Sequence, residues 1–323
     1  MNILIVKLSS LGDVVHTMPA VQDIRRALPQ AAIDWVVERG FAPLVLRCEG
    51  VRRAVPYDLR KWRKAPFSGE TRAARRAFRA DLQAQAYDAV IDLQGLTKSA
   101  LVSRAAQLAA GGKRYAMANR TDGASYEAPT RWVADVALRL EPHVHAVQRS
   151  REVCARALGY AVPQELRFGL AARDASPAGT VAFIHGTSRA DKCWPEAHWV
   201  ALGRQLAAGG SGIVLPHGSD EEEAASRRIA AAIGEAAQVW PRMKLDALAD
   251  RLAGCAGAIG VDSGLSHIAV ALDLPHVQVY NFDTAWRTGP LPGMPRQCSV
   301  YAQPTPSVDE VLAAWRQVTI ARP

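Results

Sequence analysis

The chain has 323 residues, 49% hydrophobic and 22% charged, which is the composition of an ordinary globular protein long enough for two domains. No window approaches the roughly eighteen consecutive apolar residues of a membrane-spanning helix, which excludes an integral membrane protein. The first residues lack the basic leader and cleavage site of a secretory signal. The five isolated cysteines exclude a disulfide framework or a zinc cluster and are typical of a reducing cytoplasm.

The positive charge is confined to the first half. Residues 1–160 contain 25 Lys+Arg and 15 Asp+Glu, a net charge of +10, whereas residues 161–323 contain 14 and 16, a net charge of −2. Such an excess predicts a docking surface for nucleic acid, anionic lipid or an anionic substrate, although a solvated helix face explains it equally well. The densest cluster, opposed only by Glu70, is Arg60, Lys61, Arg63, Lys64, Arg72, Arg75, Arg76 and Arg79.

Strands and helices alternate along the first half. Residues 1–7 predict a buried strand, followed by a short turn and a helix over 13–27. Further strands are expected at 32–38, 54–58 and 87–94, further helices at 41–48 and 99–109, and a loop at 119–130. This spacing predicts a parallel sheet covered on both faces.

The alternation restarts after a segment rich in Pro, Gly and Ala at 159–180, which predicts a linker. Strands are expected at 180–186, 212–218, 237–241, 257–262 and 276–281, and helices at 195–210, 220–234, 245–255 and 266–274. A last amphipathic helix at 308–320 could pack on either domain. We therefore predict an α/β fold of two doubly wound domains, residues 1–163 and 164–323, with ligands in a cleft at the carboxyl ends of the strands.

The residues after the first strand form one candidate site. Gly12 permits a close backbone approach, and Asp13 lies near the start of a helix. The aspartate serves there either as a helix cap or as a general base that deprotonates a hydroxyl. The turn lacks the GxGxxG pattern, which argues against a nicotinamide dinucleotide.

Two candidate sites follow strands of the second half. Lys192 lies in a polar loop with Thr187 and Ser188, where an ammonium meets a phosphate at a helix N-terminus. Glu222 begins the helix after residues 212–218. Its carboxylate either complements the helix dipole or accepts hydrogen bonds from ribose hydroxyls.

The third strand-end motif of this half runs from Asp262 to His267. Ser263 and Gly264 form a small-residue turn before a helix, whose free backbone N–H groups favour an anion. The carboxylate of Asp262 is not attracted to phosphate and is better suited to hold a hydroxyl or backbone groups. His267 either contacts phosphate or packs in the core.

Five stretches, IVKLSSLGDVVHTMPA, RKWRKA, DAVIDLQGLTKSA, TSRADKCWPEAHW and VDSGLSHIAVALDLP, resemble the lipopolysaccharide heptosyltransferase I enzymes of glycosyltransferase family 9. The resemblance covers nearly the whole chain. It implies a GT-B fold of two Rossmann-like domains and the inverting transfer of L-glycero-D-manno-heptose from ADP-heptose to the Kdo of Kdo2-lipid A. Heptosyltransferase II enzymes share the fold, but their motifs are less similar. No DxD-like motif stands out, so neither a metal nor a cofactor is expected.

The resemblance also implies roles for individual residues. Asp13 matches the general base, Lys192 the lysine at the donor diphosphate, and Glu222 the carboxylate at the donor ribose. The chain departs from the family at 118–132 and 281–290. Remaining donor residues are Thr187, Ser188, Asp262, Ser263, Gly264 and His267, and acceptor residues are Ser10, Gly12, Arg60, Arg63, Lys64 and Arg120.

A soluble chain with a lipid acceptor predicts peripheral attachment to the cytoplasmic face of the inner membrane. The basic first domain would contact the anionic surface, where each Lys or Arg contributes about 1 kcal/mol. Another nucleotide-sugar transferase of the superfamily is the alternative enzyme. A nucleic-acid-binding protein is favoured only by the charge, so no nucleic-acid partner is expected.

Overall fold

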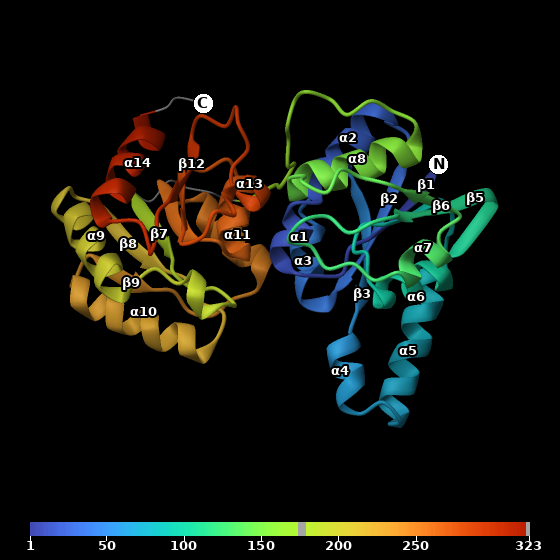
Figure 1. The fold of residues 1–323 in the computed structure, drawn as a ribbon. Helices are drawn as coiled ribbons and strands as arrows, with labels where there is room; N and C mark the ends of the chain where they lie inside the picture. Colours follow the sequence, from blue (N-terminus) through green and yellow to red (C-terminus); the bar gives the residue numbers. More distant parts are fainter. Residues whose placement is uncertain (174–178, 321–323) are drawn as a thin grey trace. The chain divides into compact units, whose positions relative to one another are not determined.

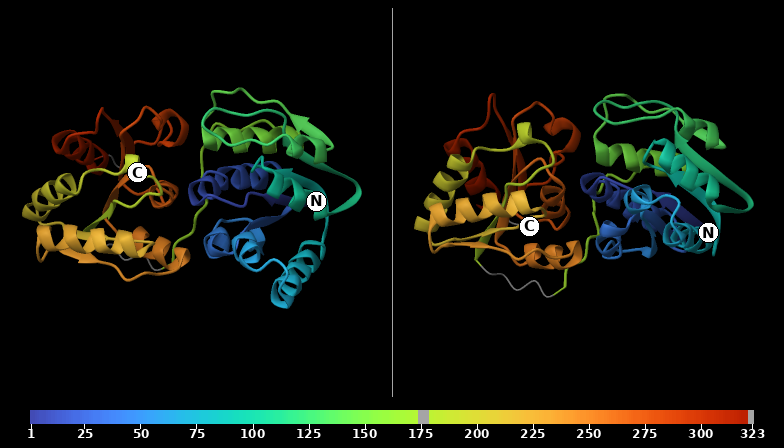
Figure 2. Two further views of the ribbon diagram at one scale, coloured as in Figure 1. Left: turned by 60° about the horizontal axis from the view of Figure 1, so that its bottom comes forward. Right: turned by 90° about the horizontal axis from the view of Figure 1, so that it is seen from below.

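The computed structural model describes residues 1–173 and 179–320. The chain divides into two compact units, Met1–Ala171 and Ala172–Pro323. Each unit contains a six-stranded parallel sheet with helices on both faces (Figures 1 and 2). The predicted fold class of two doubly wound α/β domains is therefore confirmed. Within the described ranges, no helix is both long and apolar enough to cross a membrane.

The first domain has the strand order β3-β2-β1-β4-β5-β6. β1 pairs with β2 and β4, so its carboxyl end lies where the strand order reverses, the usual ligand position in such sheets. Its strands are β1 Asn2–Val6, β2 Ala32–Glu38, β3 Val51–Tyr57, β4 Ala86–Asp92, β5 Gln107–Met117 and β6 Val136–Leu138; its helices are α1 Leu11–Val15, α2 Met18–Ala27, α3 Ala42–Val45, α4 Leu59–Lys64, α5 Gly69–Leu82, α6 Thr97–Ala105, α7 Pro129–Val133 and α8 Ala146–Leu158.

The second domain repeats this plan with the order β12-β11-β10-β7-β8-β9. Its core contains Trp194, Trp199 and Phe183, with ring centroids 4.9–5.0 Å apart. The last helix packs on β11, β12 and α9 of this domain. The strands are β7 Thr180–Ile184, β8 Gly212–Leu215, β9 Ala237–Val239, β10 Gly257–Val261, β11 His276–Tyr280 and β12 Gln297–Tyr301; the helices are α9 Glu196–Ala208, α10 Asp220–Ile233, α11 Leu245–Ala253, α12 Gly264–Ala271, α13 Ala285–Thr288 and α14 Val308–Ile320.

The division after Ala171 lies beyond the boundary expected at 163–164. Arg151 is buried against Asp23 and donates to the carbonyls of Pro163 and Glu165 at 2.7 and 3.0 Å. The Ala171 N–H donates to the Arg47 carbonyl at 2.9 Å. These contacts attach the start of the expected linker to the first domain; residues 174–178 of that linker lie outside the described residues.

Three helices differ from the sequence-based expectation. The expected helix 13–27 is two helices, α1 and α2, because Pro19 has no N–H to continue the first one. The expected helix 41–48 is reduced to α3 (Ala42–Val45), since Cys48 forms an isolated bridge with Leu170. The expected helix 99–109 ends at Ala105, because Gln107 pairs with Ala86 and begins β5.

Candidate active site

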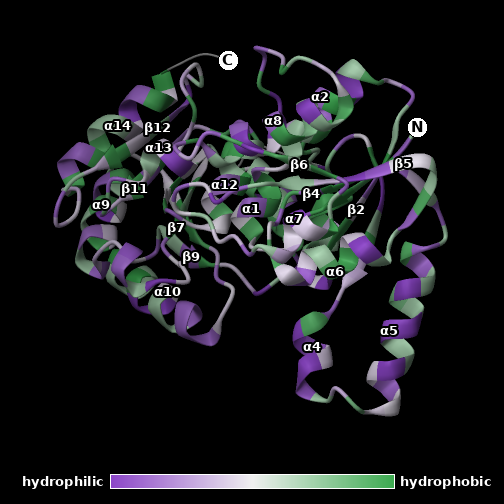
Figure 3. Cartoon of the chain, turned by 45° about the vertical axis from the view of Figure 1, so that its right-hand side comes forward, coloured by the Kyte–Doolittle hydropathy of each residue, from purple (hydrophilic) through white to green (hydrophobic). Residues whose placement is uncertain are grey.

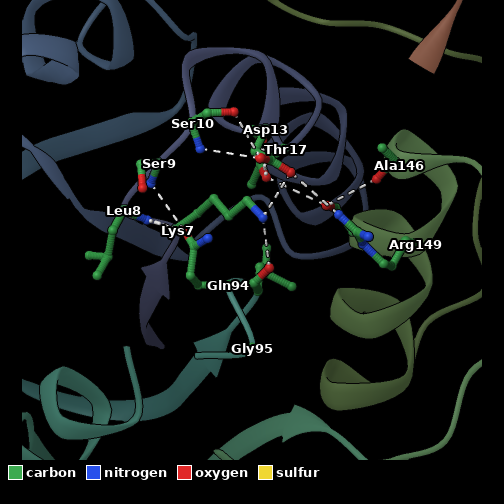
Figure 4. Close-up of polar contacts among 12 residues, drawn as sticks. Lys7, Leu8, Ser9, Ser10, Asp13, Thr17, Gln94, Gly95, Ala146 and Arg149 are labelled. Atoms are coloured by element: carbon green, nitrogen blue, oxygen red, sulfur yellow. Dashed lines mark hydrogen bonds and ion pairs between the residues drawn. The ribbon is translucent and has the colours of Figure 1, made fainter. Parts of the chain in front are cut away.

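Asp13 lies in α1, directly beyond the carboxyl end of β1 (Figure 4). The backbone N–H and the hydroxyl of Ser10 both donate to its Oδ2, at 3.2 and 3.0 Å. Thr17 binds the Asp13 carbonyl at 2.9 Å. The N-cap of α1 is therefore Ser10 and not Asp13, which lies at the third helical position and completes the capping box through its Oδ2. The Oδ1 atom takes no part in this cap.

Two cations face Oδ1 of Asp13. Lys7 Nζ lies 3.2 Å away and Arg149 Nη2 lies 3.5 Å away. The Lys7 side chain is only 3% exposed, and its ammonium also donates to the Leu93 carbonyl at 3.0 Å. Figure 4 shows Lys7 rising from the end of β1 and Arg149 reaching across from α8.

The cations decide the protonation state of Asp13. Burial alone would raise the pKa of its carboxyl, but the charges of Lys7 and Arg149 and the hydrogen bonds from Ser10 outweigh burial and lower the pKa to about 2. At neutral pH the group is therefore a carboxylate, ready to accept a proton.

Gln94 fixes the turn between β1 and α1. Its Oε1 accepts from the N–H groups of Leu8 and Ser9, each at 3.0 Å. Asp92, at the end of β4, in turn accepts from the Gln94 N–H at 2.8 Å. The adjacent strand thus holds the loop that carries Ser10 and Asp13, which is the pre-organisation that a catalytic base requires.

The expected acceptor residues are only partly brought together. Gly12 lies beside Asp13 in α1, and Arg120 lies next to Thr121, whose hydroxyl accepts from Arg149 at 3.1 Å. By contrast, Arg60, Arg63 and Lys64 lie on α4, which is separate from α1 in Figure 1. Arg60 pairs with Glu38 at 3.5 Å.

In the second domain, Asp262 is the centre of a polar cluster at the end of β10. Its side chain is 6% exposed and forms an ion pair with Lys192 Nζ through Oδ2. Oδ1 lies 3.4 Å from His267 Nε2 and accepts from Thr288 at 3.3 Å. The Thr187 hydroxyl donates to the Asp262 carbonyl at 3.2 Å. Four residues predicted for the donor therefore meet here.

The neighbours of Asp262 keep its carboxyl group ionised. Burial would raise the pKa of the Asp262 carboxyl, but His267 and Lys192 outweigh burial and lower it. Ser263 caps α12, its Oγ accepting from the Ser266 N–H at 3.5 Å, and Gly264 begins the helix. An ammonium, an imidazole and a helix N-terminus thus converge, a combination that binds phosphate.

Glu222 lies in the first turn of α10, near the Lys192 loop. Its Oε2 accepts from the Gly218 N–H at 2.6 Å. A Cβ on Gly186 would come within 2.6 Å of the Glu222 carboxylate, so only a glycine leaves this space free. Gly186 directly precedes Thr187 and links the two parts of the expected donor site, whereas Ser188 is exposed in the same loop.

Asn281 holds the Lys192 loop in place, although it begins the segment that departs from the family motif. Its Nδ2 donates to the carbonyls of Asp191 and Cys193, both at 3.0 Å. Thr305 donates to the Asn281 Oδ1 at 2.7 Å. The backbone on both sides of Lys192 is therefore fixed by one side chain.

Sequence reasoning missed Lys7, Arg149, Gln94 and Asn281. Lys7 carried a usable signal, since a lysine directly after a buried strand lies at the ligand-binding edge. Arg149 gave none, because 136 residues separate it from Asp13. Over the described residues, no group of three or more His, Cys, Asp and Glu side chains is placed to hold a metal ion.

Comparison with known proteins identifies the family. Residues 75–314 match the model of glycosyltransferase family 9 (heptosyltransferase). The chain is 43% identical to lipopolysaccharide heptosyltransferase 1 of Escherichia coli K12 over 291 residues, covering 87% of this chain and 88% of the relative. It superimposes on E. coli heptosyltransferase WaaC with ADP at a TM-score of 0.86, with 36% identity over 97% of this chain and 98% of that one. WaaC with ADP-2-deoxy-2-fluoro heptose gives a TM-score of 0.81 at 37% identity, covering 98% of both chains. The chain therefore has the GT-B type of fold and belongs to glycosyltransferase family 9, the heptosyltransferases.

Proposed function

We propose that this enzyme transfers L-glycero-D-manno-heptose from ADP-heptose to the Kdo of Kdo2-lipid A, with inversion, in the synthesis of the lipopolysaccharide inner core. The observation that carries the proposal is the ionised carboxylate of Asp13 at the ligand-binding edge of the first sheet. The relatives named lipopolysaccharide heptosyltransferase 1 support the choice of donor and acceptor.

Asp13 is the general base of the proposed reaction. The Kdo hydroxyl oxygen attacks the anomeric carbon, and the hydroxyl proton passes to Asp13 as the new C–O bond forms. A carboxylate with a pKa of about 2 is a weak base. It suffices because the hydroxyl becomes strongly acidic as its oxygen gains positive charge. Lys7 and Arg149 then also provide cations near an anionic acceptor.

The second domain binds the donor and stabilises the leaving group. As the anomeric C–O bond breaks, ADP takes the electron pair and gains negative charge. Lys192, His267 and the N-terminus of α12 stabilise this charge. Asp262 holds the Lys192 ammonium and the His267 ring in place before the donor arrives, and Glu222 accepts hydrogen bonds from the ribose.

The decisive measurement is ADP release with ADP-heptose and Kdo2-lipid A. We expect turnover that requires both substrates and falls roughly 10²–10⁴-fold in Asp13→Asn, with donor affinity unchanged. Asp122→Asn, an exposed carboxylate of the same domain, is the matched control. Near-normal turnover of Asp13→Asn would exclude the base.

Turnover only on an acceptor that already carries a heptose would assign the enzyme to the heptosyltransferase II type. Turnover that persists with a chelator would support the expected independence from metal.

The enzyme is further proposed to attach peripherally to the cytoplasmic face of the inner membrane. The first domain carries the excess positive charge, with 25 basic and 15 acidic residues over 1–160. Attraction of this kind is screened by salt. Binding to anionic vesicles should therefore weaken as salt is added, and salt-independent binding would contradict the proposal.

A further inference from the structure

The basic cluster forms a helical hairpin that projects from the first domain. This α4–α5 hairpin consists of residues 59–82 and extends away from the sheet in Figures 1 and 3. The rings of Tyr57, Trp62 and Phe78 pack together at its base, with centroids 5.1–5.6 Å apart. Ser68 caps α5 by accepting from the Thr71 N–H at 3.1 Å. The hairpin therefore presents a defined tip.

The tip is apolar. Residues 65–67, between the two helices, are exposed. Phe67 is 87% exposed, the highest value for a large apolar side chain in the part of the chain that the structure describes. Its neighbour Pro66 adds further apolar surface. Transfer of such an exposed phenylalanine side chain from water to an apolar medium is favourable, because it removes apolar surface from water.

The hairpin that carries the tip has an excess of positive charge. Residues 59–82 contain eight Lys+Arg and two Asp+Glu. Both acids already have partners: Glu70 pairs with Lys61 at 3.0 Å, and Asp81 pairs with Arg53 at 2.6 Å. The hairpin therefore offers cations to an anionic surface on either side of Phe67.

We infer that the tip of the α4–α5 hairpin inserts Phe67 into a bilayer of anionic lipids while basic residues of the two helices contact headgroup phosphates. An exposed apolar side chain flanked along the chain by basic residues is the pattern of segments that bind the membrane interface. A second copy of the chain is a poor occupant, because two basic hairpins repel each other. A nucleic-acid strand is also disfavoured, because Trp62 and Phe78 pack inward and cannot stack on bases.

The inference deepens the proposed function and rests on its peripheral attachment. Arg60, Arg63 and Lys64, proposed as acceptor contacts, lie in the same hairpin. Insertion of Phe67 would hold these cations at the level of the headgroups, where the phosphates of a lipid acceptor lie.

The test is co-sedimentation with vesicles of phosphatidylglycerol and phosphatidylcholine that contain no acceptor. We expect Phe67→Ser to weaken binding about tenfold, as loss of a buried aromatic ring implies, and Phe67→Trp to preserve it. Leu46→Ser is the matched control, since Leu46 is 54% exposed in the same domain. Equal binding of Phe67→Ser and wild type, or an equal loss in Leu46→Ser, would overturn the inference.

A second measurement separates this inference from the reaction itself. Phe67→Ser should turn over a deacylated, water-soluble acceptor like wild type, while its KM for acceptor in vesicles rises. An equal loss on both acceptors would show that Phe67 acts on the acceptor sugar and not on the bilayer. Failure of the wild type on every acceptor would refute the proposed function and leave the vesicle binding result intact.

Discussion

Asp13 is kept ionised by its neighbours. Lys7 and Arg149 approach its Oδ1 at 3.2 and 3.5 Å, and its pKa is lowered to about 2 despite burial. Because the folded-state pKa lies below that of an unfolded aspartate, the group stabilises the fold above pH ~4, and this contribution is lost as the pH falls toward 2. On the proposed function, the same charges also set the pH below which Asp13 is protonated and can no longer act as the base.

Replacing Lys7 should therefore move the acid limb of the rate profile. With wild type, we expect no loss of kcat/KM from Asp13 between neutral pH and about pH 4. Lys7→Met removes the nearer cation, so the pKa of Asp13 rises. As the pH is lowered, the variant should therefore begin to lose activity at a higher pH than wild type does. The pH dependence of ADP release measures this effect. Lys98→Met is the matched control, because Lys98 binds Ser9 and not Asp13. Identical acid limbs in Lys7→Met and wild type would contradict this account.

Gly186 should prove essential for the position of Glu222. In Gly186→Ala the new Cβ would lie 2.6 Å from the Glu222 carboxylate, which must then move. We expect KM for the donor to rise about tenfold, equivalent to about 1.4 kcal/mol, with a smaller change in kcat. Initial-rate kinetics with varied ADP-heptose measure both. Gly40→Ala is the control, since nothing lies within 4 Å of a Cβ there. An unchanged donor KM would show that Glu222 does not contact the donor.

At the scale of elements, helices α2 and α8 of the first domain are joined by a buried ion pair. Arg151 of α8 donates to both carboxylate oxygens of Asp23 in α2, at 2.7 and 3.1 Å. The same guanidinium binds the carbonyls of Pro163 and Glu165. One side chain therefore fixes two helices and the last segment of the domain.

Removing that guanidinium should destabilise the first domain strongly. Arg151→Ala leaves the buried Asp23 carboxylate without its partner, a loss of roughly 3–5 kcal/mol. Arg156→Ala on the same helix breaks an exposed i,i+4 pair with Glu152 and an exposed hydrogen bond to the Arg139 carbonyl, and should cost about 1 kcal/mol. Urea denaturation followed by circular dichroism compares the two. Equal stabilities of the two variants would refute the structural role of Arg151.

At the scale of the whole molecule, the proposed donor residues and the proposed base belong to different domains. The residues proposed to bind the donor lie in Ala172–Pro323, and Asp13 with its neighbouring cations lies in Met1–Ala171. If the proposed function is correct, ADP alone should therefore bind to and stabilise the second domain. Ligand at about 100 times its Kd stabilises a folded state by about 2.7 kcal/mol.

Hydrogen exchange should show this stabilisation in the second domain. We expect ADP to slow exchange in the Lys192 loop and at the start of α12, with less effect on β1 and α1. The Lys192→Met variant should lose this protection at the same ADP concentration, and Lys244→Met provides a control lysine of that domain. Protection confined to the first domain would contradict the assignment of the donor site.

The sequence by itself determined the two α/β domains and the position of Asp13, Lys192 and Asp262 after predicted strands, where we propose the site. Buried parallel strands are local apolar runs, and the residues directly after them lie at the ligand-binding edge whatever the rest of the chain does. The strands expected from residues 1–7 and 257–262 accordingly became β1 and β10.

Only the tertiary structure decided which groups act on these residues. Arg149 reaches Asp13 across 136 positions, and Asn281 reaches the Lys192 loop across about 90. The attachment of residues 163–171 to the first domain likewise depends on Arg151 and Arg47. Such contacts leave no local pattern, because the role of a single arginine or asparagine is recognisable only once the fold has placed its partner beside it.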